Sequence, residues 1–312
     1  METYEQLGQF YLGKAVNPET GQREQAPVLY DAKDLTTHGV LIGMTGSGKT
    51  GLGVALLEEA LIDQIPIIAI DPKGDLPNLK LQFPKLRPAD FKPWIDPRQA
   101  TAKGRTVEQY AADVAHCWQA GLAEWDQSGE RIARLKAAAE ITVYTPGSRS
   151  GRPVSVLRSF APPAALAQQD RDGFTEAVQA TVSGLLGLLG IEADPITSRE
   201  HVLLANIFEA VWQAGQTLDL ATLIQKIQAP PFERIGVMEL EAIYPAKERF
   251  ALAMQLNNLL AAPGFETWME GDPLSIDNLL YTAQGKPRAS IFSIAHLSDA
   301  CLLYTSPSPR DH

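Results

Sequence analysis

A glycine-rich segment near the N-terminal end carries the residue types that could bind a polyphosphate. Residues 43–50 are Gly-Met-Thr-Gly-Ser-Gly-Lys-Thr, which fits the phosphate-loop pattern of Gly, four residues and Gly-Lys-Ser/Thr. In such a loop the lysine, here Lys49, contacts the β- and γ-phosphates, and the hydroxyl of Thr50 ligates Mg²⁺. We therefore expect this segment to bind a nucleoside triphosphate together with Mg²⁺.

The chemistry of the loop lies largely in its backbone. Glycine adopts positive φ without a Cβ clash, so the chain can approach the phosphate oxygens closely. The N–H groups of residues 46–51 would then point inward at a helix N-terminus, whose partial positive charge favours an anion. The expected nucleotide-binding residues are Gly43, Thr45, Gly46, Ser47, Gly48, Lys49, Thr50 and Gly51. A glycine-rich turn that binds nothing is the alternative.

The segments on either side of the loop have the pattern needed to position it. Residues 40–42 form a short apolar run that predicts a buried strand, and residues 52–62 predict an apolar-rich helix. A second apolar run at residues 67–70 predicts a parallel strand covered on both faces, and it ends at Asp71. Ligands of open α/β sheets lie beyond the carboxyl ends of the strands. Asp71 is therefore a candidate for a second part of the site, with capping of the turn as the alternative.

The remaining pattern predicts an α/β core interrupted by helices. Residues 9–14 and 27–30 predict a β-hairpin, residues 106–125 and 130–140 predict helices, and residues 141–146 and 288–295 predict core strands. Helical periodicity dominates residues 164–262, where Trp212, Phe208 and Leu204 share one face and predict a core. The expected divisions are a hairpin at 1–35, the first part of the core at 36–160, an all-helical insertion at 161–285, a core strand at 286–300 and a tail at 301–312.

Composition restricts the class of protein. The chain has 312 residues, a net charge of −10 and 45% hydrophobic residues, which are ordinary values for a globular protein without a broad basic surface. Its two cysteines suit a reducing compartment and provide no metal cluster. The N-terminus lacks a secretory signal, and no apolar run approaches the roughly 20 residues of a membrane span. We expect a cytoplasmic protein without a membrane span.

Residues 77–105 form a proline-rich connector with seven Lys or Arg residues and two Asp residues. Its prolines predict that no regular helix continues through it. Two interpretations of the charge remain open, namely a solvated loop and a loop that faces DNA or a neighbouring subunit.

The phosphate loop, together with Asp71-Pro-Lys-Gly-Asp75 after the next strand, resembles the HerA–FtsK superfamily of hexameric ATPases. Residues 34–38, the helical insertion and residues 292–298 look like a bacterial HerA-like branch. The resemblance covers about residues 10–300. It implies a RecA-like P-loop NTPase fold, ATP and Mg²⁺ as ligands, a homo-hexamer, and ATP hydrolysis coupled to translocation of DNA or protein. The resemblance also implies that Asp71 and Lys73 are residues of the family motif and candidates for a second part of the site.

The expected catalytic groups are less complete than the binding groups. ATP hydrolysis needs a strand-end Asp for the metal shell and a Glu or Gln that orients water. No run of four apolar residues is followed by Asp-Glu or Asp-Asp, and Glu58-Glu59 is expected to face solvent in the first helix. Residues 301–312 resemble translated sequencing adapter, so we expect a truncated chain that binds nucleotide without turnover. The catalytic residues of the parent ATPase are left unassigned.

Several alternatives and less distinctive residues complete the interpretation. A GTPase would use the Asp71-x-x-Gly pattern but lacks a guanine-recognition motif. A small-molecule kinase could use Arg131 and Arg134 in a lid, although such a pair is more typical of a solvated helix face. A nucleotide-dependent assembly protein remains the non-enzymatic alternative. Cys117 is expected to be buried and inert, and His296 is a weaker candidate for contact with nucleotide or a neighbouring subunit.

Overall fold

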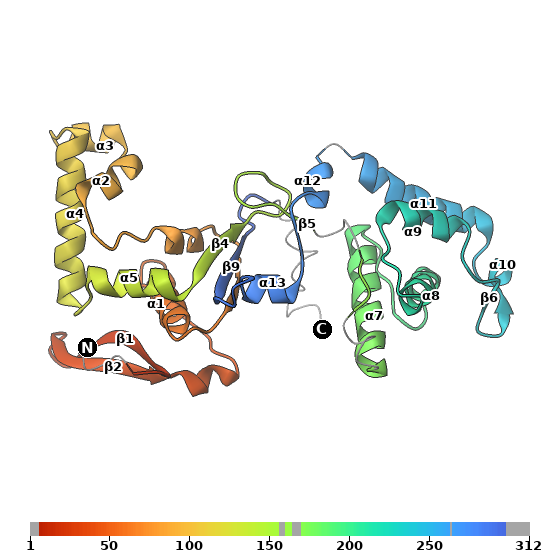
Figure 1. Ribbon diagram of the computed structural model, residues 1–312, viewed down its shortest axis with the longest axis horizontal. Helices are drawn as coiled ribbons and strands as arrows, with labels where there is room; N and C mark the ends of the chain where they lie inside the picture. The colour runs from red at the N-terminus through yellow and green to blue at the C-terminus, as the bar shows by residue number, and fades with distance from the viewer. Residues whose placement is uncertain (1–5, 156–159, 164–169, 263, 298–312) are drawn as a thin grey trace. The chain divides into compact units, whose positions relative to one another are not determined.

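The computed structural model describes residues 6–155, 160–163, 170–262 and 264–297 (Figure 1). The contacts between Cα atoms divide the chain into two compact units. The first unit consists of Met1–Val143 and Ser275–Ala295, and the second of Tyr144–Leu274 and His296–His312. The adapter-like tail expected at residues 301–312 lies outside the described residues.

The first unit is a mixed α/β structure that contains the phosphate loop. Its elements in chain order are β1 (Gln9–Val16), β2 (Arg23–Asp31), the 3-10 helix η1 (Ala32–Thr36), α1 (Lys49–Ile62), β3 (Ile67–Asp71), η2 (Leu76–Lys80), α2 (Pro88–Phe91), η3 (Lys92–Trp94), α3 (Pro97–Ala102), α4 (Val107–Glu124), α5 (Gly129–Ala138), β4 (Glu140–Tyr144), α13 (Ile276–Leu280) and β9 (Arg288–Ser293).

The central sheet of this unit has the strand order β3-β9-β4. β3 and β9 run parallel, and their register extends from Ile67 opposite Ala289 to Asp71 opposite Ser293. A parallel pair requires a crossover, and the chain between these two strands includes Tyr144–Leu274 of the second unit. The mixed α/β class with a parallel sheet and helices therefore agrees with the expectation for a P-loop NTPase fold.

β3 is covered on one face only. Ala69 and Asp71 are buried, and Val54 and Leu57 of α1 belong to the cluster that covers Ala69. On the other face Ile68 and Ile70 remain 41% and 56% exposed. The expectation of a strand covered on both faces is wrong for this structure, because side chains alternate along a strand and only one set meets a helix.

Residues 40–42 differ most from the expectation. They adopt no regular strand, and Val40 and Ile42 are 80% and 90% exposed. Leu41 is less exposed, at 44%. A strand needs a neighbour for its backbone groups, and no strand of the described residues pairs with this segment.

The N-terminal hairpin packs beside α1. β1 and β2 pair antiparallel from Gln9 opposite Asp31 to Val16 opposite Arg23, with irregular register near Gly13. The Tyr11 hydroxyl donates a hydrogen bond of 2.8 Å to the Trp125 carbonyl after α4. The hairpin is thereby fixed both to α1 and to the end of α4.

The second unit is predominantly helical. Its elements are β5 (Val154–Ser155), α7 (Arg171–Leu188), α8 (Arg199–Gln213), α9 (Leu220–Gln228), β6 (Arg234–Ile235), β7 (Met238–Glu239), α10 (Leu240–Ile243), α11 (Ala246–Ala261), α12 (Glu266–Met269) and β8 (Asp272–Pro273). An all-helical insertion was expected, but the unit also contains two short strand pairs, β5 with β8 and β6 with β7.

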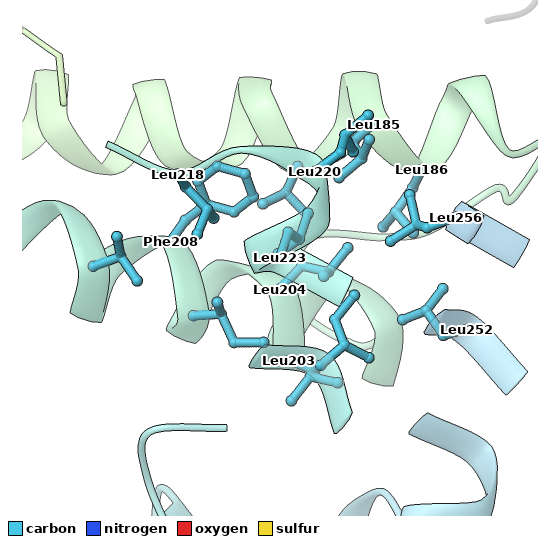
Figure 2. Packing of buried hydrophobic residues seen from close by; sticks show 14 of the residues in the cluster. Leu185, Leu186, Leu203, Leu204, Phe208, Leu218, Leu220, Leu223, Leu252 and Leu256 are labelled. Carbon is cyan, nitrogen blue, oxygen red and sulfur yellow. The ribbon is translucent and has the colours of Figure 1, made fainter. Parts of the chain in front are cut away.

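One hydrophobic cluster holds the second unit together. Figure 2 shows leucines from α7, α8, α9 and α11 gathered in one cluster, which also contains Phe208 of α8. Leu204 and Phe208 are fully buried and Trp212 is 3% exposed, so the core face predicted from their helical spacing is confirmed. Within the described residues, no helix is both long and apolar enough to cross a membrane.

Candidate functional site

The phosphate loop has the backbone geometry that its glycines predict. Gly46 and Gly48 have φ of +81° and +90°, in the left-handed region that favours glycine. A Cβ added at Gly43 would lie 2.4 Å from the Ser47 hydroxyl oxygen, so a side chain at this position would require Ser47 to change its rotamer. The sequence pattern therefore corresponds to a backbone requirement for glycine at Gly46 and Gly48.

The N-terminus of α1 has no side-chain cap. Gly48 occupies the N-cap position in the left-handed conformation, and no side-chain oxygen accepts from the first turn. The first N–H groups of a helix have no partner within the helix, so a cap, water or an anion must satisfy them. Among the turn, loop and cap hydrogen bonds of the described residues, none uses the N–H groups of Gly46, Gly48, Lys49, Thr50 or Gly51.

Lys49 places its ammonium group over the loop. Its Nζ donates to the carbonyl oxygen of Gly43 and, at 2.5 Å, to that of Met44. Thr50 follows at the second position of α1 with its side chain exposed. A cation and a set of N–H donors thus converge on an exposed loop, which is the donor set that a triphosphate and its Mg²⁺ require.

Gly48 offers a direct test of the loop geometry. The Gly48→Ala change should weaken nucleotide affinity about 5- to 30-fold, because the left-handed conformation costs a residue with a Cβ about 1–2 kcal/mol. The affinity can be measured by titration with a fluorescent ATP analogue. Gly53→Ala in α1 is the control, because its Cβ would make only an ordinary contact of 3.7 Å with Leu41. Equal affinities of the two variants would contradict the assigned role of Gly48.

Asp71 is buried at the carboxyl end of β3 and is bonded to its own loop. Its Oδ1 accepts from the backbone N–H of Gly74 at 2.9 Å, with longer contacts to those of Lys73 and Asp75, and its Oδ2 accepts from that of Leu76 at 3.0 Å. These bonds are those of a carboxylate that caps a turn. They support the capping alternative for Asp71.

The structure does not join the second candidate segment to the phosphate loop. Lys73 is exposed, and in the described part of the chain no hydrogen bond or ion pair connects Asp71 or Lys73 with residues 43–51. The loop after β3 instead lies against the end of β9, where a Cβ on Gly74 would be 3.3 Å from that of Ala295.

A buried ion pair near the other end of α1 was not predicted. Glu59 is 8% exposed, and its carboxylate is paired with the guanidinium of Arg131 on α5. The expected solvent exposure is therefore wrong for Glu59, and Arg131 is neither part of a solvated helix face nor positioned as a lid. No sequence signal distinguishes these residues, because the hairpin and α5 that bury Glu59 are far from it in the chain.

Three of the seven basic residues of the connector form ion pairs with neighbouring carboxylates. Arg87 pairs with Asp90 inside the connector, whereas Lys92 and Arg105 pair with Glu108 and Asp113 on α4. Both α4 carboxylates lie beyond residues 77–105 in the sequence. The folded connector therefore presents less free positive charge than its sequence suggests, which favours the solvated-loop interpretation.

Two other sequence candidates have ordinary surroundings. Cys117 is exposed on α4, so the expectation of a buried thiol is wrong. The buried face of α4 is formed by Ala111 and Ala115 instead. His296 is exposed, and its Nε2 lies 2.8 Å from the carbonyl oxygen of Pro146.

A comparison with protein families gives one match. Residues 10–134 match the family model of helicase HerA, central domain. The matched segment begins in β1 and ends in α5, so it includes the phosphate loop, α1 and β3. This match supports a HerA-like P-loop ATPase. Comparison with curated proteins found no match.

Proposed function

We propose that residues 43–51 bind Mg²⁺-ATP and that the chain is the nucleotide-binding part of a HerA–FtsK-type motor ATPase. The observation that carries this proposal is the loop itself, in which two glycines of positive φ lead into an uncapped helix N-terminus beneath the Lys49 ammonium. The HerA-like character of residues 10–134 supports the same class. Translocation of DNA or protein by a homo-hexamer is the corresponding proposal for the whole motor.

Each group of the loop has a distinct role in this proposal. The N–H groups of residues 46–51 would donate hydrogen bonds to the β-phosphate oxygens, which take the place of a helix cap. The ammonium of Lys49, now bonded to the carbonyl oxygens of Gly43 and Met44, would bind the β- and γ-phosphates, and the hydroxyl of Thr50 would be a ligand of Mg²⁺. Bound Mg²⁺ supplies charge neutralisation between the phosphates. Asp71 has no assigned part in this binding, because its carboxylate is bonded to the loop after β3.

We expect residues 1–312 to bind nucleotide without measurable turnover. Water activation needs a carboxylate or amide beside the γ-phosphate, and both oxygens of Asp71 are already bonded to the loop after β3. Phosphate release should therefore be the same for the unchanged chain and for Lys49→Ala, measured at saturating ATP. A steady-state rate that disappears in Lys49→Ala would contradict this expectation.

The second candidate function is that of a nucleotide-dependent assembly protein. The hydrogen bonds of Asp71 favour this function, because they occupy a carboxylate that hydrolysis would need and leave nucleotide binding intact. Size-exclusion chromatography with light scattering, with and without a non-hydrolysable ATP analogue, tests whether nucleotide drives assembly. An oligomer that forms with nucleotide but has no ATPase activity supports assembly. Competition by GTP against the ATP analogue tests the GTPase alternative in the same preparation.

A further inference from the structure

We propose that Glu59 is a positioning residue for the phosphate loop, because it fixes α1 to β1 and α5 at the end opposite Lys49. This inference rests on the proposed nucleotide binding and assigns a role to a residue outside the loop. Its basis is a set of contacts in the first unit that join three segments distant in the sequence.

The Glu59 carboxylate connects α1 to two other elements. Its Oε2 accepts a hydrogen bond of 3.0 Å from the backbone N–H of Tyr11 in β1, and its Oε1 contacts the guanidinium of Arg131 in α5. The Glu59 and Arg131 side chains are each only 10% exposed. A carboxylate is almost never so deeply buried unless it is paired. Because both partners of Glu59 belong to other elements, these contacts fix the position of α1.

A second contact fixes the last turn of α1. Asp63 follows the helix directly, and its Oδ2 accepts a hydrogen bond of 2.8 Å from the backbone N–H of Gly8. Leu61 and Ile62 pack in a cluster with Leu135 of α5. The C-terminal part of α1 is therefore held by polar bonds to the hairpin and by apolar contacts to α5.

The phosphate-binding end of α1 has far fewer constraints. Lys49 to Leu52 are mostly exposed, and buried side chains appear only from Glu59 onward. Ten residues separate Lys49 from Glu59, or about 15 Å of helix at 1.5 Å per residue. A rotation of about 5° at Glu59 would therefore displace Lys49 by about 1 Å, a shift on the scale that impairs positioning in binding and catalytic sites.

Several charged or titratable groups surround this carboxylate. Burial raises the pKa of Glu59 to about 7, from an ordinary value of 4.5. Glu58 of the same helix and Asp63 directly after it face this carboxylate and add to the rise in its pKa. The Tyr11 N–H and Arg134 oppose the rise, and the contact with Arg131 favours the ionised form. The ionised carboxylate pairs with Arg131, whereas the neutral acid does not.

This titration has opposite consequences for stability and for binding. Because its pKa is raised, Glu59 contributes to the free energy of unfolding in its neutral form. This contribution is fully present below about pH 4.5 and is lost as the pH rises through about 7. Nucleotide affinity should instead rise over this interval, because only the ionised carboxylate holds Arg131 and so fixes α1. A merely structural role would make affinity follow stability.

The test measures the affinity of the full chain for a fluorescent Mg²⁺-ATP analogue between pH 6 and pH 8. Glu59→Gln and Arg131→Gln should each weaken binding about 3- to 10-fold at pH 8, and the double variant should bind no worse than either, because they remove the same contact. Glu59→Gln should also lose the part of the pH dependence that comes from this carboxyl. Glu58→Gln removes the neighbouring charge on the same helix and should remain within about twofold of the unchanged chain.

The outcomes distinguish this inference from the proposed function. If Lys49→Ala binds as tightly as the unchanged chain, the nucleotide site itself is wrong and the inference falls with it. If Lys49→Ala loses binding but Glu59→Gln keeps its affinity and pH profile, with or without a lower melting temperature, Glu59 is structural only and the inference is overturned. Should Glu59→Gln fail to fold, Arg131→Gln decides in its place by the same comparison.

Discussion

Replacing Lys49 by alanine is expected to weaken Mg²⁺-ATP binding about 100-fold or more. A hydrogen bond to a charged group contributes about 1.5–3 kcal/mol, and Lys49 would make such bonds to two phosphates. A loss of about 2.7 kcal/mol already corresponds to 100-fold in affinity. The observed position of its Nζ, 2.5 Å from the Met44 carbonyl oxygen at the loop, gives the side chain the reach that this role needs.

The measurement is a titration with a fluorescent ATP analogue in the presence of Mg²⁺. Lys33→Ala is the matched control, because it removes the same charge from an exposed position of η1 in the same unit. The control should bind like the unchanged chain. Retained affinity in Lys49→Ala, with a circular dichroism spectrum that shows a folded protein, would refute the phosphate-loop assignment.

The largest stability effect is expected at Phe208 in the second unit. Phe208 is fully buried, and its ring forms edge contacts with Phe160 and Trp212 at centroid distances of 5.3 and 5.1 Å. Phe208→Ala should lower the free energy of unfolding by about 3–5 kcal/mol, since it removes apolar burial and leaves a cavity. Native domains have only about 5–15 kcal/mol of stability, so most of this unit's margin would be lost.

Urea unfolding followed by tryptophan fluorescence and circular dichroism measures this loss. Phe250→Ala in α11 is the control, because its side chain is 54% exposed and its removal should change the unfolding free energy by less than about 0.5 kcal/mol. Similar losses in both variants would show that the cluster in Figure 2 is not the principal core of the unit.

Local chemistry explains which features could be predicted. Helix α4 begins after Thr106, whose hydroxyl accepts from the Gln109 N–H while the Gln109 side chain accepts from the Thr106 N–H. Both partners lie within one turn, so the sequence contains the whole interaction. The same holds for the glycines of the phosphate loop, whose steric requirement is set by their own backbone. The core face of α8 likewise follows from helical periodicity alone.

The features that were missed all depend on residues distant in the chain. Cys117 lies on the exposed side of α4. Which side of this helix is buried depends on the packing of α2 against it. Residues 40–42 have the composition of a strand, but a strand forms only where another strand pairs with it. The positive charge of the connector is larger in its own sequence than in the folded protein, because carboxylates of α4 pair with two of its basic residues.

The sequence by itself determined the phosphate loop, because its glycines, its lysine and its threonine act within a single turn of backbone. Only the tertiary structure decided what surrounds the helix that the loop begins. Burial of Glu59 requires β1 on one side and Arg131 of α5 on the other, and the bonding of Asp71 depends on how the chain folds after β3. The packing of the fold determines whether a carboxylate faces water, a backbone amide or a guanidinium.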